Sequence, residues 1–190
     1  MEQLWYSFSD VIPIFTVMIP FVLGISWLHF KRQRKKGLSH REAFFFSSTG
    51  ALFILSIIGI LLVTLLPIYG MRSQTLQLKP FSSILHLLEY SITASVTIRL
   101  IGFNMILFMP FGLFFSLRFH RKMSVWTITF LGMLFSTGIE TAQYVLAIGR
   151  TSNIDDVILN TTGTFIGALI GLLISKLFFK KTRKKSIRNK

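Results

Sequence analysis

The sequence predicts an all-α integral membrane protein, a polytopic helical bundle of about five transmembrane helices with a short outer interfacial or re-entrant helix. Hydrophobic residues occupy 52% of the 190 positions, charged residues occupy only 15%, and the mean hydropathy is +0.62. Soluble domains of this size usually have about a quarter of their residues charged. The composition therefore leaves no room for a separate soluble catalytic domain.

Apolar runs long enough to cross a bilayer, each about 20 residues, are separated by charged or polar segments. The predicted spans are residues 11–30, 43–66, 98–117, 125–148 and 157–179. The segment 81–92 is too short and too polar to span, since it carries His86 and Glu89. We expect this segment to lie at the outer surface. Because no internal repeat or low-complexity linker is present, residues 1–190 are expected to form a single domain.

The basic residues are distributed very unevenly along the chain. Seventeen of the 21 lysines and arginines lie in three segments next to apolar runs, 31–41, 118–122 and 176–190. The positive-inside rule places such segments in the cytoplasm. We therefore expect a multi-pass protein of the cell membrane, with its N-terminus outside and a basic cytoplasmic tail at 180–190. The net charge is +14. Because the basic residues cluster beside apolar runs, we expect them to contact membrane lipids and not nucleic acid.

Polar residues on three predicted spans share one depth in the outer part of the bilayer. At a rise of about 1.5 Å per residue, Asn104, Glu140 and Asn160 lie roughly 6 to 12 Å below the outer interface. Intramembrane polar groups are costly, and they usually face a bundle interior or a watery cavity. Together with the charged residues above them, they form the candidate ligand-binding site, which consists of Lys79, Arg99, Asn104, Glu140, Gln143, Arg150, Asp155, Asp156 and Asn160.

The first hypothesis for this polar layer is binding of an anionic lipid or cell-wall precursor of the outer leaflet. Lys79, Arg99 and Arg150 would hold a phosphate through charge-assisted hydrogen bonds. The alternative is a membrane enzyme that acts on a lipid-linked substrate, with Glu140 or Asp156 as general base. The sequence supports no reaction class, because it has no cysteine, no Ser-His-Asp order and no phosphate-binding glycine loop. It also lacks a zinc-ligand pair, so we predict neither a metal site nor a cofactor.

A third hypothesis makes the polar layer a buried network that only fastens the helices together. Glu140 would then pair with Arg99 or Arg150, and Asn104 would pair with Asn160. Close helix contact is predicted separately by small residues spaced four apart, which let two backbones approach. These residues are Gly163, Gly167 and Gly171.

Several motifs resemble the VanZ-like family. Besides KPF at 79–81, they are RLIGFNMILFMPFG at 99–112, ETAQ at 140–143, GR at 149–150 and DDVILNTTG at 155–163. The resemblance is strongest over 79–167, and Asn153 departs from it because many members carry an acidic residue there. It implies a small polytopic bacterial protein of the cell envelope. The founding member is linked to lowered susceptibility to the glycopeptide teicoplanin, but the resemblance implies no known reaction.

Overall fold

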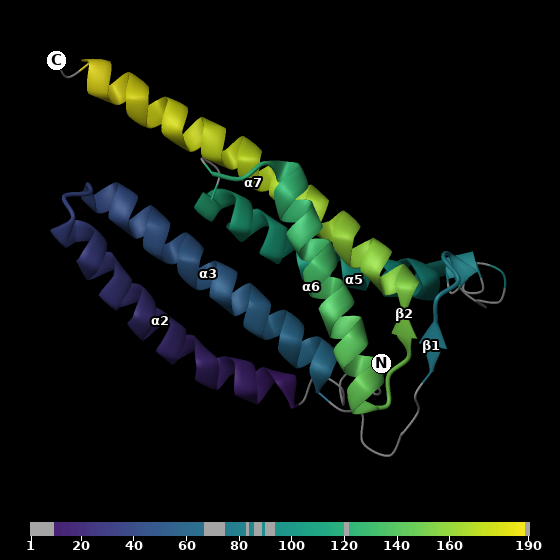
Figure 1. Cartoon of the computed structure of the whole chain (residues 1–190). Coiled ribbons are helices and arrows are strands. Elements are labelled where there is room, and N and C mark those ends of the chain that lie inside the picture. Colours follow the sequence, from purple (N-terminus) through teal and green to yellow (C-terminus); the bar gives the residue numbers. More distant parts are fainter. Residues whose placement is uncertain are drawn as a thin grey trace.

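A computed structural model describes residues 10–66, 75–82, 84, 85, 89, 94–119 and 122–188, with side chains omitted at 94–100 and 178–188. Its helices are α2 (Val11–Lys35), α3 (His40–Leu65), α5 (Ala94–Phe119), α6 (Val125–Leu146) and α7 (Ile154–Arg188). Figure 1 shows α2 and α3 as a hairpin beside a group made of α5, α6 and α7. The prediction of an all-α fold is confirmed.

Each predicted span coincides with one of these helices. The helices α2 and α7 continue past the predicted ends of their spans, because lysine and arginine are good helix formers and are favoured at helix C-termini. The expected tail at 180–190 is therefore helical as far as Arg188. The turn between α2 and α3 lies at the same end of the bundle as the C-terminus (Figure 1). We call this end, where the basic segments gather, the basic end.

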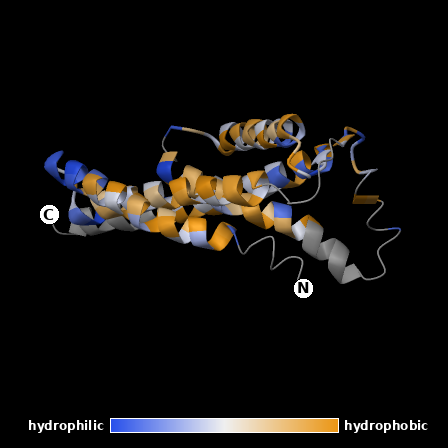
Figure 2. Ribbon diagram, turned by 90° about the horizontal axis from the view of Figure 1, so that it is seen from below, coloured by the Kyte–Doolittle hydropathy of each residue, from blue (hydrophilic) through white to orange (hydrophobic). Residues whose placement is uncertain are grey.

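Among the described residues, four helices are long and apolar enough to cross a membrane. They comprise residues 11–35, 40–65, 101–119 and 154–177. Helix α6 is not one of them, because polar residues such as Glu140 lower its hydropathy. Figure 2 shows hydrophobic residues along the lengths of the helices. The fifth span stays a prediction, as does the outer helix at 81–92, where only Ser82, Ile84, Leu85 and Glu89 are described as helical.

Local signals in the sequence explain where the helices begin. The Ser39 hydroxyl accepts the backbone N–H of Glu42, and the Glu42 carboxylate accepts the backbone N–H of Ser39, so α3 starts at a complete capping box. The Ser124 hydroxyl caps α6 in the same way by accepting the Thr127 N–H. Between α2 and α3, Gly37 has a φ of 83°, which glycine adopts without steric cost.

Helix α5 is the centre of the bundle. It presents phenylalanines at helical spacing, of which Phe108 and Phe111 are buried in a core that also includes Ile60 of α3 and Ile139 of α6. On another face it packs against α7 through glycine: a Cβ at Gly167 would overlap a backbone carbonyl oxygen of α5. The predicted close contact through spaced glycines is confirmed.

Two very short strands join segments at the end of the bundle opposite the basic end, which we call the outer end after the orientation that the sequence predicts. Strand β1 (Leu76–Gln77) pairs in parallel with β2 (Ser152–Asn153), which directly precedes α7. The Ser152 N–H also donates to the Thr75 carbonyl at 3.0 Å. The sequence indicates only a polar loop at this position, because two residues are too few to show a periodic pattern.

Candidate functional site

The polar layer lies where α6 ends and α7 begins, and it contacts α3 through Thr64 and α5 through Asn104. One of its buried carboxylates is Glu140, which is 7% exposed. The Glu140 carboxylate accepts the backbone N–H of Asn153 at 2.7 Å and a hydrogen bond from the Ser152 side chain. Glu140 therefore holds β2 against α6. Of the two predicted arginine partners, Arg150 lies close enough for its charge to act on Glu140, whereas the side chain of Arg99 lies outside the described residues.

Asp155 is a second anchor, and it holds the described residues that follow β1, namely 78–82, 84 and 85, which we call the outer segment. Its carboxylate accepts the backbone N–H of Phe81, and that of Ile84 at 3.2 Å. The Asn153 side-chain oxygen accepts the Asp155 N–H at 3.0 Å and so caps the start of α7. Asp155 is 1% exposed. Of the two adjacent aspartates, this one is occupied in fastening the outer segment.

Asp156 faces α5, where its carboxylate accepts a hydrogen bond from the Asn104 amide. One turn further along α7, the Asn160 amide donates to the Ser136 hydroxyl of α6 at 2.9 Å. The expected pairing of Asn104 with Asn160 is therefore wrong, because each asparagine reaches a different helix. Asn160 is 4% exposed, and its side-chain oxygen is buried without a hydrogen-bond partner among the described residues.

Gln143 joins α6 to α3. It is buried, and its side-chain amide donates to the Thr64 carbonyl at 3.0 Å near the C-terminal end of α3. The last turn of a helix leaves carbonyl groups without intrahelical partners, so this contact satisfies one of them. Gln143 thus connects the polar layer to α3.

Arg150 lies in the short loop between α6 and α7 and is partly buried. Its Nε is buried and has no hydrogen-bond partner among the residues that the structure describes. Burial lowers the pKa of the Arg150 guanidinium, and the charges of Asp156 and Glu140 oppose this shift. The guanidinium therefore lies near both carboxylates, and its Nε–H donates to none of the described residues.

The predicted residues are not all brought together. Asn104, Glu140, Arg150, Asp156 and Asn160 surround the junction of α6 and α7. Lys79 is exposed on the outer segment, whereas the side chain of Arg99 lies outside the described residues.

Sequence reasoning missed three polar partners in this layer. Ser136 has a detectable signal, because it lies four residues before Glu140 and so shares the polar face of α6. Ser152 and the backbone of Thr64 have no such signal, since their roles depend on tertiary contacts. Within the described parts of the chain, no group of three or more histidine, aspartate or glutamate side chains is placed to hold a metal ion.

An apolar groove of about 260 Å³ lies between α3 and α6 at the level of the polar layer. Leu61 and Leu65 of α3 form one side. Ile139 and Ala142, the sequence neighbours of Glu140 and Gln143, contribute to the other. The polar layer is thus bordered by a surface suited to a hydrocarbon chain.

Comparison with known proteins identifies the family of the chain. The family model described as VanZ/LLP1 matches residues 52–176, a range that contains all nine candidate residues. Protein VanZ of Enterococcus faecium is 31% identical over 121 residues, which cover 62% of this chain and 67% of that protein. No solved structure matches the chain significantly. The predicted resemblance is confirmed, and the chain belongs to the VanZ/LLP1 family.

Proposed function

We propose that this protein binds the phosphate-bearing headgroup of an anionic lipid or cell-wall precursor in the outer leaflet. The observation that carries the proposal is the partly buried Arg150, whose buried Nε has no hydrogen-bond partner among the described residues. Leaving such a donor unsatisfied costs about 1–3 kcal/mol, and more for a charged group. A phosphate that accepts bidentate hydrogen bonds from the guanidinium would remove this cost.

The carboxylates of Glu140 and Asp156 restrict the kind of headgroup. A bare anion would be repelled by them, whereas hydroxyl groups could donate to the carboxylate oxygens. The arrangement therefore favours a headgroup that carries hydroxyls next to its phosphate, as glycerol and sugar phosphates do. The groove between α3 and α6 offers a place for the attached hydrocarbon chain.

Binding is favoured over catalysis by the way the carboxylates are used. Glu140 accepts a backbone N–H at 2.7 Å, and Asp156 accepts a side-chain amide hydrogen bond from Asn104. A general base needs to reach the proton that it abstracts, and both groups already serve as internal acceptors. We further propose that occupancy of this site lowers susceptibility to teicoplanin, as the resemblance to the VanZ-like family implies.

The proposal is tested by replacing Arg150 with lysine in the purified protein. Lysine keeps the charge that neighbours the carboxylates but cannot reproduce a planar bidentate grip. We expect affinity for one phosphatidylglycerol molecule to fall about tenfold, the equivalent of one charge-assisted hydrogen bond. Native mass spectrometry against increasing lipid would measure this loss.

Arg34→Lys is the matched control, because Arg34 is exposed at the basic end and is not among the charges that act on the polar layer. It should bind as much lipid as wild type. In cells, Arg150→Lys should reach normal membrane levels yet lose any protection against teicoplanin. Equal lipid binding by the two variants would refute the proposal. Turnover of a bound lipid that Glu140→Gln abolishes, while binding persists, would favour the enzyme alternative.

The orientation of the chain is a separate prediction. Thr151 is exposed beside the polar layer, and Lys36 is exposed in the turn between α2 and α3 at the basic end. Since the chain contains no cysteine, single cysteines at these positions can be labelled selectively. We expect an impermeant maleimide to label Thr151→Cys, but not Lys36→Cys, in intact cells. The opposite result would place the polar layer on the cytoplasmic side.

A further inference from the structure

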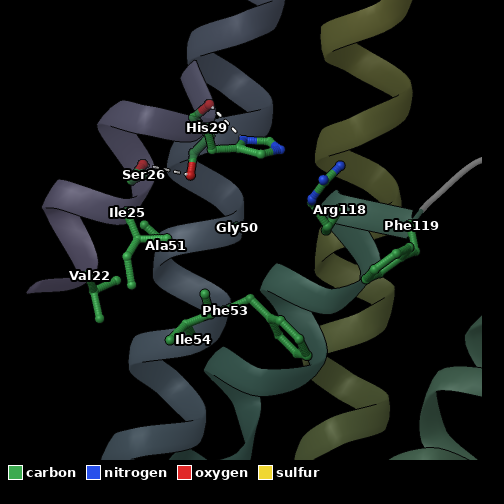
Figure 3. Close-up of a pocket in the computed structure, with 11 residues that line it drawn as sticks. Val22, Ile25, Ser26, His29, Gly50, Ala51, Phe53, Ile54, Arg118 and Phe119 are labelled. Carbon is green, nitrogen blue, oxygen red and sulfur yellow. Dashed lines mark hydrogen bonds between the residues drawn. The ribbon is translucent and has the colours of Figure 1, made fainter. Parts of the chain in front are cut away.

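A second pocket lies toward the basic end of the bundle, away from the polar layer. Its volume is about 220 Å³, and it is formed by α2, α3 and the C-terminal end of α5 (Figure 3). Val22 and Ala51 are buried in its walls, whereas Ile25 and Ile54 are 59% and 40% exposed. The pocket therefore opens sideways onto the apolar outer surface of the helices. We call it the basic-end pocket.

One wall of the pocket carries an ordered polar network. The Ser26 hydroxyl donates to the Ser47 carbonyl at 3.0 Å, and His29 Nδ1 lies 3.0 Å from the Ser47 hydroxyl. The other ring nitrogen of His29 lies 3.0 Å from the Gln33 amide. Both nitrogens of the imidazole thus have protein partners. This network fixes α2 against α3. The hydroxyl of Ser26 and the ring nitrogens of His29 already have hydrogen-bond partners within the protein.

Arg118 lies across the pocket from His29 (Figure 3). Its guanidinium stands 5.5 Å from the ring centre of Phe46 and 5.7 Å from that of Phe119, so aromatic faces hold it in place. A guanidinium has five N–H donors, and within the described part of the chain none of those of Arg118 has a hydrogen bond or an ion pair. Arg118 is therefore an oriented cation whose N–H groups are not used by any residue that the structure describes.

The described charges that line the pocket or act on His29 are all positive. No aspartate or glutamate lines it, and Arg32 and Lys36 of α2 lie close enough to act on the charge of His29, as Arg118 does. A pocket with apolar walls, a sideways opening and one oriented guanidinium is complementary to an anionic amphiphile. Water would find few partners in it, because most of its lining is hydrocarbon.

We propose that the basic-end pocket binds an anionic phospholipid of the leaflet at the basic end, with its phosphate on Arg118. One acyl chain would run over Ile25, Phe53 and Ile54 toward the lipid-facing surface. A volume of 220 Å³ suits a segment of one chain and leaves the rest of the lipid in the bilayer. Much of this site, including Ser26, His29 and Gly50, precedes residues 52–176, so the pocket extends beyond the region shared with the family.

The experiment uses the absence of native cysteine. Ser26→Cys places one thiol in the pocket, and Thr16→Cys places one on an exposed position of the same helix. Both proteins are reconstituted in nanodiscs of phosphatidylcholine with increasing phosphatidylglycerol, and the rate of reaction with neutral N-ethylmaleimide is measured. We expect phosphatidylglycerol to slow labelling at position 26 but not at position 16. Equal rates in the two lipids at position 26 would overturn the proposal.

Variants of Arg118 assign the effect to its guanidinium. In the Ser26→Cys protein, Arg118→Gln should weaken protection by phosphatidylglycerol about tenfold, and Arg118→Lys should restore part of it. Arg150→Gln should leave this protection unchanged, so failure of the outer site and failure of this one can be told apart. Full protection in the Arg118→Gln protein would show that the lipid does not contact Arg118, and the proposal would be wrong.

Discussion

Replacing Gly167 with leucine should remove most of the folded protein from the membrane. A Cβ at this position would overlap the carbonyl oxygen of Met109, and Gly163 meets Met105 in the same way one turn earlier. Backbone atoms cannot rotate away as a side chain can, so α5 and α7 would have to separate. We expect a loss of about 3 kcal/mol or more in folding free energy, at or beyond the upper end of ordinary overpacking. Quantitative blotting of membranes and thermal unfolding in detergent would measure it.

Gly24→Leu is the matched control for this substitution. Gly24 lies in α2, and a Cβ there would meet nothing within 4 Å. Leucine is a better helix former than glycine by up to about 1 kcal/mol, so this variant should be at least as abundant as wild type. If both leucine variants fell equally in abundance, close packing through Gly167 would not be what holds α5 and α7 together.

Asp155→Ala should release the outer segment from the bundle. The carboxylate accepts hydrogen bonds from the backbone N–H groups of Phe81 and Ile84. Alanine has no side-chain acceptor, so both N–H groups would lose their hydrogen-bond partner. Each unsatisfied donor costs about 1–3 kcal/mol, which predicts a combined loss of about 2–6 kcal/mol for this part of the structure. Chymotrypsin should then cleave faster after the exposed Phe81, and the protein should unfold at a lower temperature.

Asp155→Asn distinguishes anchoring from a role of the negative charge. Asparagine retains one side-chain acceptor, so this variant should keep part of the resistance to chymotrypsin that the alanine variant loses. A ligand or cation site that depends on this carboxylate would instead respond similarly to both substitutions. Identical cleavage rates for wild type and Asp155→Ala would contradict the anchoring role.

The sequence by itself determined the class of the fold and the position of every long helix. The apolar runs between the basic segments show where the helices lie, because a helix that crosses a bilayer requires about 20 apolar residues. The spacing of Gly163 and Gly167 also determined which face of α7 packs closely. The end of α7 at Arg188 was not predicted, since the hydropathy pattern stops at the membrane boundary whereas the helix does not.

The sequence also located the polar layer, because depth along a helix follows from counting residues at about 1.5 Å each. Only the tertiary structure decided which groups the polar side chains of this layer form hydrogen bonds with. Counting along one helix does not give its rotation relative to a neighbour, so Asn104 reaches Asp156 and not Asn160. Glu140 and Asp155 bind backbone amides of irregular segments, and such amides are identical in every residue except proline. Their positions depend on how the chain folds back, which leaves no pattern in the residue types.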